Sequence, residues 1–252
     1  MNIHIQNGRL VDPASHTDQL ADVFIASGKI VGTGGTAPQG FKAEKVLNAT
    51  GCIICPGLID LSARLREPGF EYKATLESEM AAAAAGGVTR LACPPDTDPV
   101  LDEPGLVEML THRARLPAFA HVHPVGALTV QLAGKQLTEM AELYEAGCVA
   151  FGQANQAIVD TQVLLRAMQY AATFDFPVWL QAQDPFLAQS GVAHEGEIAA
   201  RLGLTGIPVA AETIALATLL QLARETGVRL HVTRISSVAG VDMIVAARAA
   251  GI

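Results

Sequence analysis

Two pairs of closely spaced residues are of types that can bind metals or, for cysteine, carry out redox chemistry. Cys52 and Cys55 are separated by two residues, as in a redox motif or half of a zinc site, and His121 and His123 are separated by one residue on a predicted strand. Zinc needs about three or four nitrogen, sulfur or oxygen donors. No second cysteine pair follows the first, and no other histidines have ligand spacing. We therefore interpret the cysteines as core residues and the histidines as strand residues with hydrogen-bonded rings.

Nucleophilic hydrolysis lacks its usual sequence patterns. Ser62 and the pair Ser236 and Ser237 have no histidine and carboxylate in a recognised arrangement, and no G-x-S-x-G motif is present. The glycine pair at 86–87 lacks the lysine and serine of a phosphate-binding loop. We interpret these residues as parts of turns.

The segment 56–69 is the strongest candidate for a functional site. It reads PGLIDLSARLREPG, an apolar strand followed by a polar loop that carries Arg64 and Arg66. In α/β barrels the active site lies at the C-terminal ends of the strands. We therefore expect this loop to lie at such a site.

This segment resembles the first barrel strand of the dihydroorotases, in the amidohydrolase superfamily, whose pattern is P-G-x-I-D-x-H-x-H-x-R-E-P-G. Further matching stretches are AAAAGGVT at 82–89, CPPDTDPV at 93–100, PVGALT at 124–129, CVAF at 148–151 and GLTGIPVAAE at 203–212. The resemblance implies a barrel that holds one or two zinc ions and opens or closes a cyclic ureide by amide hydrolysis.

The metal-ligand positions of that family are occupied by other residue types here. The resemblance places them at Ser62, Arg64, Gln153, Gln181 and Arg234, with Ala154 beside Gln153. Of the family's two histidines after the sixth strand only His231 is left, and its last aspartate would lie beyond Ile252. Arginine keeps its proton below about pH 12, so Arg64 and Arg234 would place two fixed positive charges where a dication binds. We predict no metal, no cofactor and no catalytic residue.

The substrate side of the pattern is only half kept. Arg66 matches the arginine that binds the substrate carboxylate in the family, but its companion asparagine is Asp96 here. A carboxylate at that place repels an anionic substrate. We predict that Arg66 pairs with Asp96 in a water-poor charge network with Arg64 and Arg234; a retained anion site is the alternative.

Two parts of the chain differ in their predicted elements. Short β-prone runs at 2–6, 9–11, 22–25 and 29–32 are separated by turn signals at Asn7–Gly8, Asp12–Pro13 and Ser27–Gly28. From residue 53, strands near 53–60, 88–93, 118–125, 147–152, 176–181 and 228–233 alternate with helices that have apolar residues three and four apart. We predict a small N-terminal β-sandwich module at 1–52 and an α/β barrel at 53–252.

The barrel is predicted to be of the (β/α)8 TIM-like amidohydrolase type, cut short after about six βα units. A parallel barrel closes by pairing its last strand with its first, so ending there would leave the strands at 53–60 and 228–233 with unpaired edges. We therefore expect the native polypeptide to continue past Ile252.

Composition excludes several classes of function. The 252 residues have a formal net charge of −8, are 50% hydrophobic and have a mean hydropathy of +0.31. This charge repels nucleic acid, and no basic cluster offsets it. No uncharged apolar run approaches the roughly 18 residues of a membrane span, and the N-terminus does not resemble a secretory signal. Four cysteines that suit a reducing compartment favour a cytoplasmic protein.

The resemblance and the replaced ligands together predict a pseudoenzyme. Some bacteria carry an inactive dihydroorotase homologue that holds the catalytic chains of aspartate transcarbamoylase in a mixed assembly, a dodecamer, and we expect this non-catalytic role in pyrimidine biosynthesis. One alternative is an active dihydroorotase or related cyclic amidohydrolase with a divergent metal site. Another is a small-anion sensor that uses Arg64, Arg66 and Arg234.

Overall fold

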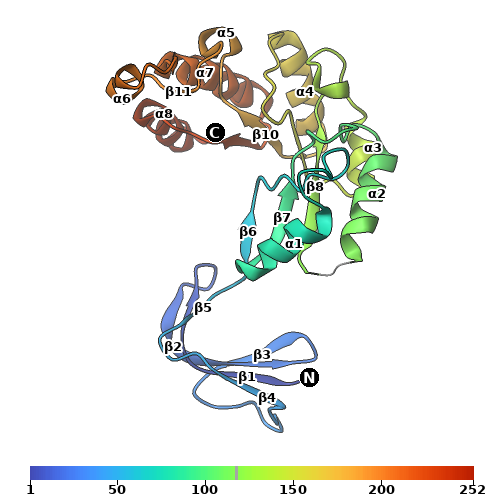
Figure 1. The fold of residues 1–252 in the computed structure, drawn as a ribbon, viewed down its shortest axis with the longest axis vertical. Coiled ribbons are helices and arrows are strands. Elements are labelled where there is room, and N and C mark those ends of the chain that lie inside the picture. Colours follow the sequence, from blue (N-terminus) through green and yellow to red (C-terminus); the bar gives the residue numbers. More distant parts are fainter. Residues whose placement is uncertain (117–118) are drawn as a thin grey trace. The chain divides into compact units, whose positions relative to one another are not determined.

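The chain forms two compact units. The computed structural model describes residues 1–116 and 119–252, and divides them into Met1–Leu58 and Ile59–Ile252 (Figure 1). The division lies within the stretch 53–60, which the sequence analysis treats as one strand. In the structure this stretch contains two short strands, because Pro56, between them, has no N–H to donate to a sheet.

The N-terminal unit is built on one five-stranded sheet in the order β3-β2-β1-β4, with β5 also paired to β1. Its strands are β1 (Ile3–Asp12), β2 (Thr17–Ala26), β3 (Lys29–Gly34), β4 (Lys45–Asn48) and β5 (Ile53–Ile54). Phe24 is buried and stacks on the ring of His4 with centroids 4.4 Å apart. The described residues of this unit show no second sheet, so the predicted sandwich stays a prediction.

One predicted turn of this unit is wrong. Asn7 and Gly8 lie inside β1, where the pairing with β2 shifts in register and Asn7 has φ +60°. A side chain at Gly8 would place its Cβ 2.4 Å from Cδ1 of Ile54. The Asn-Gly pair therefore forms a β-bulge that lets Ile54 approach, and not a hairpin turn. The turns at Asp12–Pro13 and Ser27–Gly28 are confirmed.

The C-terminal unit contains a six-stranded sheet in the order β13-β10-β9-β8-β7-β6. The strands are β6 (Leu58–Asp60), β7 (Val88–Cys93), β8 (His121–Ala127), β9 (Ala150–Gly152), β10 (Val178–Gln181) and β13 (Leu230–Thr233). The pairs from β7 to β13 are parallel. The predicted parallel α/β sheet is thus confirmed, while residue 118, the predicted start of the third strand, lies outside the described residues. A short parallel pair, β11 (Ala193–His194) and β12 (Gly206–Ile207), follows β10.

The helices accompany this sheet (Figure 1). They are α1 (Leu76–Ala85), α2 (Pro104–Arg115), α3 (Met140–Glu145), α4 (Thr161–Thr173), α5 (Pro185–Ala188), α6 (Glu197–Arg201), α7 (Val209–Thr226) and α8 (Val238–Ala249), with a 3-10 turn at Val130–Leu132. Thr75 and Ser78 form a capping box at the start of α1, and Gly227, with φ +69°, ends α7. Apolar side chains of α4 and α7, among them Met168 and Leu216, pack with Phe151 of β9 in the main core.

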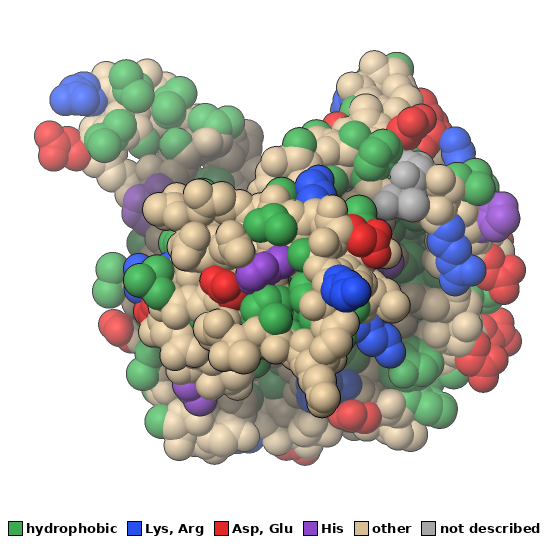
Figure 2. All heavy atoms as spheres, turned by 90° about the horizontal axis from the view of Figure 1, so that it is seen from below, with side chains coloured by type: hydrophobic (Ala, Val, Ile, Leu, Met, Phe, Trp, Pro, Cys, Tyr) green, Lys and Arg blue, Asp and Glu red, His purple; other side chains and the backbone are tan. Residues whose placement is uncertain are grey.

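One face of the molecule is mixed in character. Figure 2 shows acidic, basic and apolar side chains interspersed on the face that it presents. No described helix is both long enough and apolar enough to cross a membrane.

A buried carboxylate holds the loop that follows β13. Glu212, 8% exposed on α7, accepts hydrogen bonds from the N–H and hydroxyl of Ser236, both at 2.7 Å, and from the N–H of Ser237 at 3.0 Å and its hydroxyl. A Cβ at Gly240 would lie 2.4 Å from Oε1 of Glu212. Burial by itself raises the pKa of Glu212, but the serine hydrogen bonds outweigh it and lower the pKa below its ordinary value. The loop that begins at Arg234 is thereby fixed against α7.

Replacing Glu212 with glutamine should therefore destabilise the protein in a pH-dependent way. Hydrogen bonds to a charged acceptor contribute about 1.5 to 3 kcal/mol. Because the folded pKa is below the unfolded value of about 4.3, the contribution of Glu212 is complete above that pH and is lost as the pH falls through the folded pKa. Urea unfolding at pH 7 and near pH 4 measures this, and we expect the gap between wild type and Glu212→Gln to shrink at the lower pH. An equal gap at both pH values would contradict the assignment.

Candidate functional site

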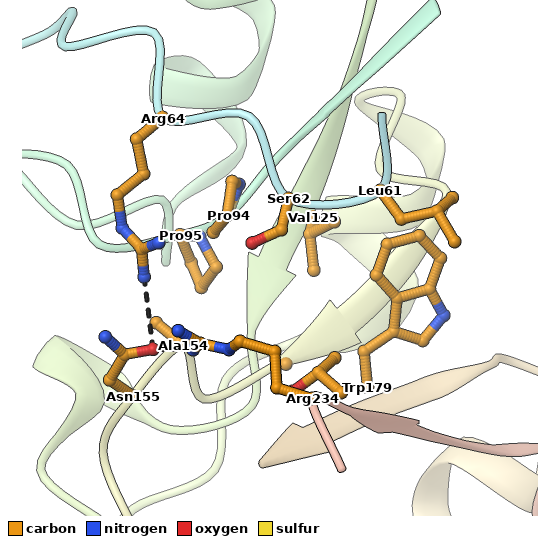
Figure 3. A pocket seen from close by; sticks show the side chains of 12 residues that line it. Leu61, Ser62, Arg64, Pro94, Pro95, Val125, Ala154, Asn155, Trp179 and Arg234 are labelled. Carbon is orange, nitrogen blue, oxygen red and sulfur yellow. Dashed lines mark hydrogen bonds between the residues drawn. The ribbon is translucent and has the colours of Figure 1, made fainter. Parts of the chain in front are cut away.

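A pocket lies where the C-terminal ends of the parallel strands meet (Figure 3). Because parallel strands end at the same edge of a sheet, residues distant in sequence converge there. The pocket is lined by Leu61, Ser62, Arg64, Pro94, Pro95, Val125, Gly152, Ala154, Asn155, Trp179, Thr233 and Arg234.

The two arginines of this pocket share one acceptor. Nη2 of Arg64 donates to Oδ1 of Asn155 at 3.2 Å, and Nη2 of Arg234 donates to the same oxygen (Figure 3). Arg64 also donates from Nε to Oδ2 of Asp96 at 2.7 Å, and Arg234 donates to Oε1 of Gln181 at 3.1 Å. The structure therefore joins Arg64 and Arg234 through Asn155. Asp96 is added through Arg64, and Gln181 through Arg234.

The predicted pairing of Arg66 with Asp96 is wrong. The partner of Asp96 is Arg64, and the pair is only partly buried: the two side chains are 25% and 29% exposed, while Oδ1 of Asp96 is shielded from solvent. In an extended strand, residues 64 and 66 would point to the same face. Arg66 has φ +66°, in the left-handed region, so the extended run ends there and the two side chains do not share a face. Arg66 instead lines a neighbouring pocket with Phe70 and Lys73.

The remaining predicted positions are divided between the pocket and the core. Ser62 lines the pocket, and its N–H donates to Oδ1 of Asp60 at 2.8 Å. Gln153 is fully buried and donates to the hydroxyl of Thr129 at 2.7 Å. It does not line the pocket, although the sequence analysis grouped it with the other metal-frame positions.

Asn155 and Trp179 are site residues that the sequence analysis did not identify. Asn155 follows the Gln153–Ala154 pair directly, so a polar residue at the end of β9 was the available signal. Trp179 precedes Gln181 by two residues on β10 and therefore shares its face of the sheet. Its ring lies 5.1 Å from that of His231, which is thus packed against an indole.

The other candidate metal residues have structural partners or lie apart. Nε2 of His123 and Nη1 of Arg90 are 3.1 Å apart, and burial, with the charges of Arg90 and His121, lowers the pKa of His123. This neutral ring accepts the guanidinium N–H, as expected of a hydrogen-bonded strand histidine.

The cysteines divide into two pairs. Cys52 and Cys55 are exposed, so their interpretation as core residues is wrong; they flank the short strand β5 in loops. Cys93 and Cys148 are buried, and burial raises the pKa of each thiol to about 12.

The fold and the position of the pocket define the class of the protein as part of an α/β barrel, with a parallel half-barrel sheet and a pocket at the strand ends. The L-hydantoinase (dihydropyrimidinase) from Arthrobacter aurescens superposes with a TM-score of 0.81 at 22% identity, covering 99% of this chain and 56% of that one. The dihydropyrimidinase from Brevibacillus agri gives 0.74 at 24% identity, covering 100% of this chain and 56% of that one. At these identities the likeness concerns the fold.

The chain belongs to the dihydro-orotase-like family, whose model matches residues 51–239. A "dihydroorotase-like protein" of Pseudomonas aeruginosa is 48% identical over 252 residues, and one of Pseudomonas putida is 46% identical. A "dihydroorotase" of Syntrophotalea carbinolica is 43% identical over 251 residues. All of this chain is covered in each case, and it spans 59% of the length of each of these relatives.

The residues of the pocket do not fit the zinc centre that the resemblance implies. Guanidinium groups carry permanent charge and have no free electron pair to donate, and Arg64 and Arg234 both reach Asn155 at this place. Within the described ranges, no group of three or more histidine, cysteine, aspartate or glutamate residues is arranged to hold a metal ion.

Removing the carboxylate of Asp96 should destabilise the protein by an intermediate amount. We expect Asp96→Ala to lower the free energy of unfolding by about 1.5 to 3 kcal/mol, because Arg64 loses a charged hydrogen-bond partner at a half-buried place. Arg229→Ala is the control: it breaks the exposed Arg229–Asp175 pair, worth about 0 to 1 kcal/mol. Denaturant unfolding measures both variants, and equal effects would contradict the proposed difference.

Proposed function

We propose that this chain belongs to a non-catalytic dihydroorotase homologue that supports assembly of the aspartate transcarbamoylase catalytic chain in pyrimidine biosynthesis. The observation that carries the proposal is the pair Arg64 and Arg234 at positions where the family pattern has metal-binding histidines. Membership of the family supports the placement in pyrimidine metabolism. The partner follows from the resemblance to inactive homologues of this kind.

The chemistry of the pocket supports the absence of catalysis. In hydrolysis of this type, a metal lowers the pKa of water from about 15.7 to about 7. The carboxylate nearest the arginines, Asp96, is paired with Arg64, so its negative charge already faces a cation. Gln181 hydrogen-bonds to Arg234 and to Oε1 of Gln183 at 2.7 Å. Neither side chain replaces a metal-generated nucleophile.

An active enzyme is the second candidate, and the names of the relatives favour it. The relative from Syntrophotalea carbinolica is called a dihydroorotase at 43% identity. A working site would need metal ligands or a general base outside the residues described above.

Metal content and turnover separate these two candidates. We expect the purified full-length protein to hold far less than about one zinc ion per chain and to show no dihydroorotate turnover, because the ligand positions carry guanidinium and amide groups. The double variant Ser62→His, Arg64→His should not recover turnover, since Gln181 and Arg234 still replace ligands. Elemental analysis and a hydrolysis assay, with an active dihydroorotase as the positive control, check this. One zinc per chain with turnover would overturn the non-catalytic role.

The scaffold role is tested by co-expression of the full-length protein with the aspartate transcarbamoylase catalytic chain. We expect one mixed complex in size-exclusion chromatography with light scattering, of the mass of a dodecamer, and a change in the assembly state of the catalytic chain when this protein is omitted. The active dihydroorotase of the same organism, where one exists, is the matched control. Separate elution of the two proteins over a range of concentrations would contradict the proposal.

A further inference from the structure

We propose that a groove between α4 and α7 binds a small organic ammonium ion, and that Asp184 is the residue that recognises its charge. The groove lies apart from the arginine pocket of Figure 3, because the two have no lining residue in common among the described residues. The proposal goes beyond the scaffold role and does not depend on it.

The groove is large enough for a six-membered ring. Its volume is about 140 Å³, close to the roughly 150 Å³ of an apolar protein cavity that takes up benzene. Three buried side chains line its floor: Leu164 of α4, Leu180 of β10 and Leu219 of α7. An apolar floor of this kind favours the apolar body of a ligand over water.

The rim of the groove carries apolar side chains that are left in water. Val159, Phe186 and Ile214 all line it, and each is more than half exposed. They come from three different segments, which are the loop after β9, helix α5 and helix α7. A ring seated between them removes part of this apolar surface from water, and the gain in free energy grows with the area removed.

Asp184 brings a fixed negative charge to this apolar groove. Its half-buried carboxylate accepts hydrogen bonds at Oδ1 from the N–H groups of Phe186 and Leu187, both at 2.9 Å, which hold it at the start of α5. Oδ2 makes no hydrogen bond within the described part of the chain. This oxygen can accept an N–H from a ligand.

The surroundings of Asp184 favour a cation. No lysine, arginine or histidine is among the described lining residues, and none of the described cations lies within ion-pair distance of Asp184. Arg234 donates to the lining residue Gln181 but does not line the groove itself. A second carboxylate, that of Asp160, caps α4 next to the rim residue Val159. Negative charge therefore predominates here, which attracts a cationic ligand and repels an anionic one.

Benzylammonium has the chemistry that this groove fits. Its ring matches the size of the apolar space, and its ammonium group is a charged N–H donor for Asp184. Benzyl alcohol has nearly the same shape without the charge. The two compounds together separate recognition of the charge from burial of the ring.

Ligand-observed NMR titration of the full-length protein with benzylammonium at low salt tests the site. We expect saturable binding, weakened at least about threefold by Asp184→Asn, because hydrogen bonds to a charged acceptor are stronger than those to an amide. Asparagine caps helices as well as aspartate does, so α5 keeps its cap in this variant. Asp242→Asn removes an exposed carboxylate from α8; it is the matched control and should leave the affinity unchanged.

A second variant tests the position of the site. Thr218 lines the groove, and its hydroxyl donates only to the carbonyl of Ile214 on the same helix, at 3.1 Å. Thr218→Phe should therefore fill the groove with its own ring and abolish benzylammonium binding, without leaving a partner in the core unpaired. Circular dichroism and the thermal midpoint establish that each variant is folded.

Each outcome decides one part of the proposal. No saturable binding of benzylammonium would overturn the site, and unchanged binding in folded Thr218→Phe would overturn its position. Benzyl alcohol that binds as tightly as benzylammonium, or equal benzylammonium affinity in Asp184→Asn, would overturn the recognition of charge. None of these outcomes bears on complex formation with the transcarbamoylase chain, so the two proposals fail separately.

Discussion

Parallel pairing of the strands from β7 to β13 is the constraint on which the rest of the site depends. It directs the C-terminal ends of these strands to one edge, and so brings Asn155 and Arg234 together although they are far apart in sequence. Arg64, from the loop after β6, reaches the same Asn155. The same geometry that assembles metal centres in barrel enzymes here assembles a cluster of permanent positive charge.

A cluster of like charges needs acceptors to hold it. Asp96 offsets the charge of Arg64, and the amide oxygens of Asn155 and Gln181 accept from Arg234. Amides accept these hydrogen bonds without neutralising the guanidinium of Arg234. The amides and the arginines of this pocket therefore support one another, since Asn155 and Gln181 accept hydrogen bonds from Arg234.

The loops that carry these groups are fixed by their own local contacts. Glu212 holds the segment after Arg234 through Ser236 and Ser237. Near the first arginine, the carboxylate of Glu67 accepts from Leu76 N–H at 2.9 Å and from Arg113 at 2.7 Å. These contacts lie outside the pocket and hold the segments that lead to it.

The sequence by itself determined the family and the parallel sheet, because apolar periodicity and short motifs are local properties of the chain. Local signals also located most of the strands. The Asn7–Gly8 pair is an exception: it forms a bulge and not a turn, because Ile54 packs against that backbone. Only the tertiary structure decided that Asp96 pairs with Arg64, that Gln153 is in the core, and that Asn155 joins the two arginines. Such pairings depend on residues with a left-handed backbone conformation, such as Arg66. They also depend on loops from different strands, which meet only when the sheet is formed.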